Sequence, residues 1–446
     1  MKPYWLVAIP LLGAGIVWMT RRWRVLVTGL GLASMLFCAY LVVCLPLGEV
    51  IPFLGQIWSL DRNMQPWLLF MYGITVVLLV IAASTEQVSS FSAPALASVG
   101  LFSAVILLRS WMSFLLVPAA LAVLALAVYP SVPAAVRAAS RYLTCVSLPI
   151  PFFLAISILL DRFALFPDEV SLANWGAWLV IPPIVLWLTL FPIHWTTLLW
   201  AKGNPPLAPA FLWTVKDWIV IFFFLALWQQ MPFLRTENTM AVLGSLGVLT
   251  VVFSGAWAVL QSSPSAVLGC AAMSALGIAV QGIAVGSDEA LAGAISVLIH
   301  RGIAILLASS ALAALYSSIN EECAAKERSF SWPGLALLLI FLISVLALAV
   351  LPLYSHFGGG QHTAAALQAR ESRLMQAWWV SSVGIVIGLA RTSWQLWRDK
   401  VRVSAKPISI PVLVAICLFL LWLWLESSPS LIWGWVSRVI APFLPL

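Results

Sequence analysis

Lys216 and Asp217 stand inside an apolar run, Leu207–Met231, that is long enough to cross a bilayer as a helix. Charged side chains at membrane depth are costly, so they usually face a water-filled cavity or a partner group and mark a route for protons or ions. The pair is therefore a candidate proton relay; a neutral local pair and a salt bridge to a neighbouring subunit are the alternatives. Because adjacent helical residues point about 100° apart, each is expected to have its own partner.

Three more residues are relay candidates: His300, His194 and Arg141. His300 lies in a second apolar run and can change its charge near physiological pH, whereas the alternative is a core histidine that only makes hydrogen bonds. Arg301 follows it, and the sequence favours a pairing with lipid phosphate or with a partner subunit. His194 follows a proline in a third apolar run, where it is a relay group or a helix cap.

The sequence predicts no metal site and no cofactor. His356 and His362 flank a glycine run without nearby carboxylates, which makes a poor metal site. The cysteines show no CxxC or Cys/His spacing, and packing in a core is their expected role. They are scattered along the chain: Cys38, Cys44, Cys145, Cys270, Cys323 and Cys417.

The elements that position these residues must be membrane helices. Hydrophobic residues form 63% of the chain, charged residues 9%, and the mean hydropathy is +1.04, which excludes a soluble domain of this length. The apolar runs are about 20 residues long and do not alternate, so the fold class is all-α and polytopic. We expect fourteen spans: 3–19, 25–47, 66–84, 92–108, 110–129, 139–160, 174–196, 208–230, 238–260, 264–286, 289–316, 333–355, 374–393 and 408–425.

Basic residues in the loops predict the orientation. Thirteen lie after odd-numbered spans, among them Arg21, Arg22 and Lys202, and eight lie on the other side. The positive-inside rule then places both termini away from the cytoplasm. The first run, Tyr4–Met19, is followed by Thr-Arg-Arg-Trp-Arg and not by a small-residue cleavage site, so no signal peptide is expected. The tail Ser430–Leu446 is amphiphilic and is expected to lie on the membrane or against a partner helix.

Two spans are expected to be broken. The seventh ends in Leu190-Phe191-Pro192-Ile193-His194, and the twelfth in Val350-Leu351-Pro352-Leu353-Tyr354. A proline removes a backbone donor and can interrupt its helix. Interruptions at matching places in two halves indicate an internal repeat with sites at the breaks.

The chain resembles the antiporter-like membrane subunits of respiratory complex I, related hydrogenases and Mrp-type cation/proton antiporters. Phe191-Pro192-Ile193-His194-Trp195, with Gly203 and Pro205 after it, looks like their F-P-F-H-x-W signature. Arg141-Tyr142 is similar to the basic-Tyr pair that opens their sixth span. Three further stretches match in order and spacing: Gln261–Gly277, Ser296–His300, and Leu346–Gly359 with the sequence LALAVLPLYSHFGG.

The resemblance implies one transmembrane domain with two inverted five-helix repeats: residues 92–236 (spans 4–8) and 237–394 (spans 9–13), followed by 395–446. It also implies a relay from a glutamate in span 5 and a lysine in span 7 through further lysines or histidines to span 12. Here those positions hold other residues, since no Asp or Glu occurs between Glu86 and Asp161. They fall at Pro118-Ala119, Trp187, Ser265, Ala304 and Gly360, while Lys216, His300 and Arg141 remain.

The favoured function is therefore an antiporter-like membrane-arm subunit of a complex I-like (NADH/quinone oxidoreductase-type) assembly, with most relay charges lost. The alternatives are a membrane partner of a cation/proton antiporter or of an inorganic-carbon uptake system, and a purely structural spacer. The expected partners are other membrane subunits and the lipid bilayer of an inner, plasma or thylakoid-type membrane, and no nucleic acid. The chain holds no catalytic centre in any of these readings, so an enzyme activity would belong to the assembly.

Overall fold

A computed structural model describes residues 2–53, 55–85, 87–108, 110–126, 133–165, 170–322, 332–349, 372–400, 410–426 and 429–443. Within these residues, ten helices are long and apolar enough to cross a membrane. The protein is an integral, multi-pass membrane protein built almost wholly of helices, as the fold class predicted.

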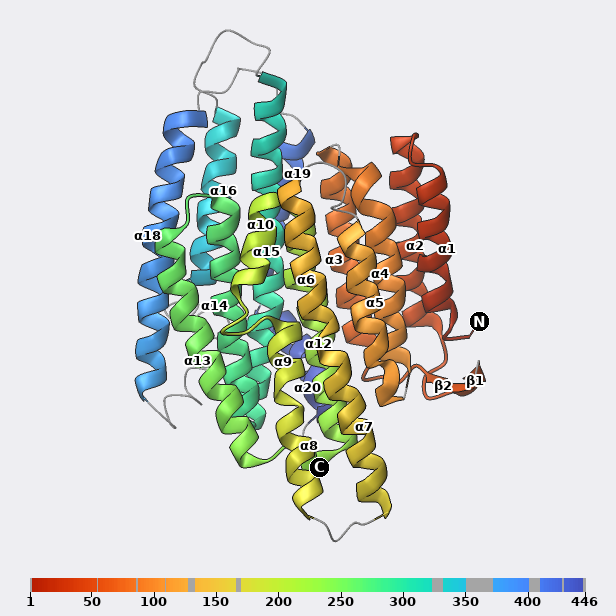
Figure 1. Cartoon of the computed structure of the whole chain (residues 1–446). Coiled ribbons are helices and arrows are strands. Elements are labelled where there is room, and N and C mark those ends of the chain that lie inside the picture. The colour runs from red at the N-terminus through yellow and green to blue at the C-terminus, as the bar shows by residue number, and fades with distance from the viewer. Residues whose placement is uncertain are drawn as a thin grey trace.

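The first half of the chain forms a row of packed helices, some long and some short (Figure 1). Its elements are α1 (Trp5–Met19), α2 (Arg24–Cys44), α3 (Gln65–Ser84), α4 (Val88–Leu107), η1 (Trp111–Leu115), α5 (Leu116–Leu126), α6 (Pro133–Ser147), α7 (Pro149–Leu165), α8 (Val170–Leu179), α9 (Ile181–Leu188), α10 (Trp195–Gly203), α11 (Leu207–Phe211), a π-helical turn (Leu212–Lys216) and α12 (Asp217–Gln230).

The second half continues with helices of similar length on the other side of the bundle. Its elements are η3 (Pro232–Leu234), α13 (Glu237–Leu260), α14 (Pro264–Val285), α15 (Asp288–Glu322), α16 (Trp332–Ala349), α18 (Ser372–Lys400), α19 (Ile410–Glu426), α20 (Pro429–Ile440) and η4 (Ala441–Phe443). In Figure 1, α1 and α2 lie at one end of the row of helices and α18 at the other, with α12, α14 and α15 between them.

The expected spans differ from the helices in a few places. The sixth is divided at Leu148 into α6 and α7, and the seventh turns at Val180 between α8 and α9. A two-stranded antiparallel hairpin, β1 (Val50–Phe53) and β2 (Gln56–Ser59), follows α2 and was not predicted. The count of fourteen spans and the two inverted repeats stay predictions, and the expected break at Pro352 lies outside the described residues.

The break in the seventh span is present where the proline motif predicted it. Helix α9 ends at Leu188, and Thr189 takes a left-handed conformation (φ 52°) that no longer continues the helix. The peptide bond between Phe191 and Pro192 is cis. The freed amide of Phe191 donates a 2.9 Å hydrogen bond to Oγ1 of Thr250 on α13, so a neighbouring helix satisfies the interrupted backbone. The chain becomes helical again at Trp195.

Close contacts between small residues hold α13, α14 and α18 together. A Cβ atom added to Gly277 on α14 would lie 2.7 Å from the carbonyl oxygen of Gly247 on α13. A Cβ atom at Gly384 on α18 would collide with the carbonyl of Gly255. Membrane helices lack a hydrophobic force between them and associate through such close packing. These glycines are therefore structural contacts of the bundle.

The amphiphilic tail packs against other helices of the same chain, in agreement with the second of its two expected placements. Helix α20 contacts α15 and α3. Trp435 stacks on Trp218 of α12, with ring centroids 6.2 Å apart. Phe443 lies edge-on to Trp67 at 6.1 Å. The alternating Trp and apolar residues of the tail bury one face on the bundle.

Candidate functional site

Lys216 and Asp217 lie at the junction of the π-helical turn and α12, in the centre of the bundle. Both side chains are closed off from solvent, with relative exposures of 0% and 1%. In the π turn, the amide of Asp217 donates to the carbonyl of Thr214 and not to that of Trp213 four residues back. The Trp213 carbonyl, the usual α-helical acceptor for this amide, is thereby available to another donor. A membrane-buried charge was predicted here, but its partners could not be.

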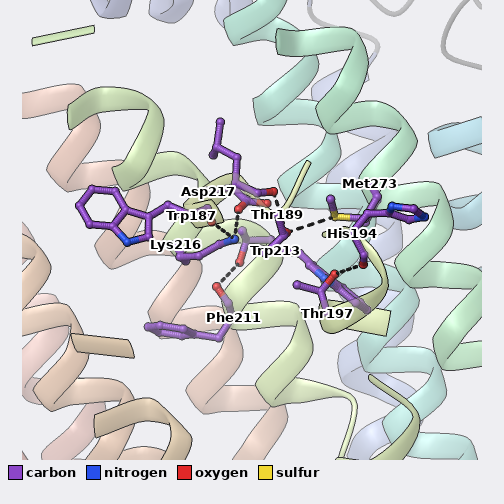
Figure 2. A network of polar contacts seen from close by, with 12 residues as sticks. Trp187, Thr189, His194, Thr197, Phe211, Trp213, Lys216, Asp217 and Met273 are labelled. Carbon is purple, nitrogen blue, oxygen red and sulfur yellow. Dashed lines mark hydrogen bonds and ion pairs between the residues drawn. The ribbon is translucent and has the colours of Figure 1, made fainter. Parts of the chain in front are cut away.

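The ammonium of Lys216 reaches the broken end of α9. Its Nζ donates a 2.7 Å hydrogen bond to the carbonyl oxygen of Trp187, as Figure 2 shows. The last four carbonyls of a helix have no partner within it, and the C-terminal end carries a partial negative charge. Lys216 thus supplies both the donor and the positive charge that this buried helix end needs. Trp187 is the position at which the family resemblance placed the lysine of span 7.

Lys216 and Asp217 each have a partner of their own, as expected, and they also pair with each other, which was not expected. Nζ of Lys216 lies 2.5 Å from Oδ1 of Asp217. The backbone directions of the two residues diverge, but the long lysine side chain folds back to the carboxylate. The neutral local pair, one of the alternatives, is therefore part of the arrangement.

Arg301 is the third member of the site, and its expected pairing with lipid or with another subunit is wrong. Its Nη2 lies 2.6 Å from Oδ2 of Asp217, and its Nε donates a 2.8 Å hydrogen bond to the carbonyl of Ala272 on α14. A further nitrogen donates to the carbonyl of Trp213 in the π turn. The signal was available in the sequence, because Arg301 interrupts the apolar run of α15 as sharply as Lys216 interrupts its own.

We call Lys216, Asp217 and Arg301 the charge triad. Two cations share one carboxylate, so the fully charged triad carries an excess of one positive charge. Three backbone carbonyls, of Trp187, Ala272 and Trp213, accept hydrogen bonds from the two cations. Buried charges persist only when they are paired and hydrogen-bonded. Each charge of the triad is paired, and hydrogen bonds reach Lys216, Arg301 and Oδ2 of Asp217, whereas among the described residues Oδ1 of Asp217 makes only its ion pair with Lys216. The triad joins α9, the π turn, α12, α14 and α15 at one point.

His300 lies beside the triad along α15 and bonds to its own helix. Its Nδ1 lies 2.7 Å from the carbonyl oxygen of Ser296 and 3.4 Å from the hydroxyl of the same residue. The imidazole is 5% exposed. This geometry is that of a hydrogen-bonded core histidine, the alternative weighed for it.

His194 is brought to the same break as Trp187 but not to the triad. It precedes α10, and its side chain makes no capping hydrogen bond. Neither ring nitrogen has a hydrogen-bond partner among the described residues. The ring lies between aromatic groups, 6.0 Å from Phe191 and 6.4 Å from Trp257, and in Figure 2 it points away from Lys216.

Arg141 is exposed on α6 and is not part of the triad. The next residue, Tyr142, is buried and stacks on Trp200 of α10, with ring centroids 5.1 Å apart. In the basic-Tyr pair, Arg141 therefore faces solvent or lipid, and Tyr142 packs inside the bundle. Of the five candidates, the structure places only Lys216 and Asp217 in one ionic cluster.

Comparison with solved structures gives the fold class of the chain. A chain of the membrane-bound sulfane sulfur reductase, an archaeal respiratory membrane complex, superposes with a TM-score of 0.82 at 15% identity, covering 98% of this chain and 96% of that one. A chain of the Mrp complex from Dietzia sp. DQ12-45-1b gives 0.77 at 15% identity, with coverages of 98% and 96%. A chain of respiratory complex I from Thermus thermophilus gives 0.73 at 19% identity, with coverages of 98% and 100%.

The chain thus has the fold of the antiporter-like membrane subunits, and the resemblance seen in its motifs is confirmed at the level of fold. No family model and no curated protein sequence matches it. The divergence agrees with the motifs, none of which is intact.

Proposed function

We propose that this protein is an antiporter-like membrane-arm subunit of a multisubunit, complex I-like assembly, and that it completes the arm without carrying a proton route of its own. The shared fold over 98% of the chain supports the first part, because the similar chains belong to respiratory and Mrp membrane complexes. The charge triad supports the second part.

The closed bonding of the triad is the observation that carries the proposal. A proton relay needs a group that can lose its proton and move between partners. Here the Lys216 ammonium is held between a carbonyl and a carboxylate, and the same carboxylate is bound by a guanidinium that does not release protons at physiological pH. The Asp217 carboxylate stabilises both cations in one arrangement. The triad therefore acts as a structural lock at the broken helix.

The positions around the triad support the same conclusion. Trp187 and Ala304, which replace relay lysines of the family, are buried, with exposures of 0% and 3%. Ser265 is buried as well and cannot carry a charge. The side chain of Trp187 donates a 3.0 Å hydrogen bond to the carbonyl of Val146, so it also fills a structural role. Packed aromatic and small residues stand where a relay would need titratable groups.

Large apolar side chains remain exposed at both ends of the row of helices. On α2 they include Leu36, Phe37 and Tyr40, and on α18 they include Trp379 and Val383. Lipid or adjacent membrane subunits would cover these two faces, as expected for a chain set between neighbours in a membrane arm. In this proposal both termini face away from the cytoplasm, and spans 4–8 and 9–13 form the two repeats.

The test compares Lys216→Met with Arg301→Gln in the intact native assembly, reconstituted in vesicles. The measurement is the number of protons moved per substrate turned over, which does not depend on how much assembly survives. A structural lock predicts that both variants lower the yield of assembly and that neither changes this ratio. A ratio that falls in Lys216→Met but not in Arg301→Gln would show that the lysine conducts, and would overturn the proposal.

A further inference from the structure

A cavity of about 440 Å³ opens beside the hairpin end of the bundle, away from the charge triad. It lies between the start of α3, the end of α4, η1, the end of α12 and the C-terminal η4. Pockets of 300 to 1,000 Å³ that combine apolar walls with a few polar groups are typical of small-molecule sites. The volume of the cavity lies in this range, and its walls also combine apolar side chains with a few polar ones.

The deep part of the cavity is apolar. Val105 and Ile106 of α4 and Phe222 and Phe223 of α12 line it, and each is 5% exposed or less. Water in a cavity needs two to four polar partners to stay there, and these side chains offer none. The deep part is therefore suited to an alkyl chain or a similar apolar body.

The rim of the cavity is polar and lies at the ends of the helices. The amides of Asn63 and Gln230 are exposed there, and the hydroxyls of Ser110 and Ser113 stand between them. Amides and hydroxyls can each donate and accept hydrogen bonds. Asp61 is the one charged side chain among the described lining residues. A ligand head that carries hydroxyl groups and no charge matches this rim, whereas an anionic head would meet a carboxylate.

A cluster of tilted and edge-on aromatic rings adjoins the cavity on the side of Asp217. Trp67 of α3 lies 4.2 Å from Trp218 and 5.1 Å from Phe222, and Phe443 packs edge-on to Phe222 at 6.3 Å. Trp218 directly follows Asp217 in α12. These rings extend the apolar wall that Phe222 and Phe443 give the cavity.

From this gradient of polarity we infer that the cavity binds one molecule of an uncharged amphiphile, with its apolar chain against Phe222 and Phe223 and a hydroxyl-bearing head at Asn63, Gln230 and Ser113. The chemical class is that of an acylglycerol or a neutral glycolipid. The molecule would also pack against Phe443 and so would hold η4 on the bundle. The inference is independent of the proton question.

The test uses the full chain in lipid nanodiscs and a monoacylglycerol with a photoreactive diazirine on its acyl chain. After illumination, mass spectrometry locates the labelled peptides. We expect labelling within residues 217–230, competed by unlabelled monooleoylglycerol. Ala226→Trp, which fills the cavity from α12, is expected to reduce this labelling at least tenfold. Ala241→Trp is the matched control, because Ala241 is exposed on α13 and does not line the cavity.

Head-group selectivity is tested in the same membranes with a fatty acid and an alkylamine that carry the same photoreactive chain. The fatty acid should label residues 217–230 several-fold less than the monoacylglycerol. An alkylamine that labels more strongly than the monoacylglycerol would show that Asp61 sets the head-group preference and would overturn the inference. Gln230→Leu, at an exposed rim position where folding is not at stake, should reduce the preference for the glycerol head and leave the acid and amine unchanged. Labelling that persists in Ala226→Trp, or a fatty acid that labels equally well, would overturn the inference. If Ala226→Trp does not fold, a Gln230→Leu protein that still prefers the glycerol head would overturn the inference.

Discussion

The ammonium nitrogen of Lys216 lies 2.7 Å from the carbonyl oxygen of Trp187, although 29 residues separate them in the chain. The contact joins the one lysine inside the described membrane core to the C-terminal end of α9, where the seventh span is interrupted. The resemblance in sequence placed a lysine of span 7 at Trp187; in this chain the positive charge reaches the break from the next span. There it satisfies a carbonyl and a carboxylate at the same time.

The charge balance of the triad predicts an order of stability among three variants. Asp217→Asn leaves two buried cations facing each other, and removal of one partner from a buried ion pair costs about 3–5 kcal/mol. Lys216→Met leaves the neutral Asp217–Arg301 pair, so its cost should be clearly smaller. The measurement is the thermal unfolding midpoint of the purified protein. Asp161→Asn, an exposed carboxylate, is the control and should change nothing. A larger loss in Lys216→Met than in Asp217→Asn would contradict the charge argument.

Arg301→Lys tests whether the triad depends on shape as well as on charge. The guanidinium bonds to the Asp217 carboxylate, to the Ala272 carbonyl and to the Trp213 carbonyl in three directions. A lysine keeps the charge but presents a compact ammonium on a flexible stem, and so cannot span these acceptors. We expect a loss of about 1–3 kcal/mol of stability, the range for buried acceptors left without donors.

The readout for Arg301→Lys is hydrogen exchange of the π turn as well as the unfolding midpoint. Faster exchange at Leu212–Lys216, with α1 and α2 unchanged, would locate the defect at the open Trp213 carbonyl. An unfolding midpoint equal to that of the parent protein would show that the charge alone is enough.

The sequence predicted where most helices lie, but it did not predict which side chains contact one another. Apolar runs of about 20 residues locate membrane helices because the bilayer sets their length, and Pro192 located the break because proline cannot continue the hydrogen-bond ladder. The link between Asp217 and Arg301 depends on how α12 and α15 are placed in space, which no local pattern encodes. The hairpin Val50–Phe53/Gln56–Ser59 was missed because it is short and follows an apolar run. The cavity is formed by helix ends from distant parts of the chain, so it had no local signal either.

His194→Phe should leave the protein as stable as the parent or make it more stable. The imidazole is 5% exposed, makes no hydrogen bond to a described residue and lies between Phe191, Phe253 and Trp257. Burying a polar ring without a partner costs free energy, and a phenyl ring removes that cost. The expected change is between zero and about 1 kcal/mol in favour of the variant, measured as a shift of the unfolding midpoint. A destabilised His194→Phe protein would show that the imidazole has a partner, such as a buried water.

Gly277→Leu should prevent α13 and α14 from packing. An added Cβ atom would lie 2.7 Å from the Gly247 carbonyl and 2.8 Å from Cγ2 of Val251, both in a neighbouring helix. Since the backbone would have to move, we expect loss of the folded protein from the membrane fraction. Gly73→Leu is the matched control, because nothing lies within 4 Å of a Cβ atom there. It should be neutral or slightly stabilising, since glycine inside a helix costs about 1 kcal/mol relative to alanine. Equal expression of the two variants would show that the helices have room to separate.

The proposed orientation can be tested with two single cysteines placed at opposite ends of α2. The helix has 21 residues, so it is about 32 Å long at 1.5 Å per residue, enough to cross the hydrocarbon core. Arg22 lies in the exposed turn before it, and Asn63 lies exposed after the hairpin that follows it. The bias of loop arginines and lysines places the Arg22 side in the cytoplasm. In a background without native cysteines, a membrane-impermeant maleimide added to intact cells should therefore label Asn63→Cys. Arg22→Cys should react only after the membrane is opened. The opposite labelling pattern would show that the protein has the reverse orientation in the membrane. The amphiphile cavity would then open on the opposite face.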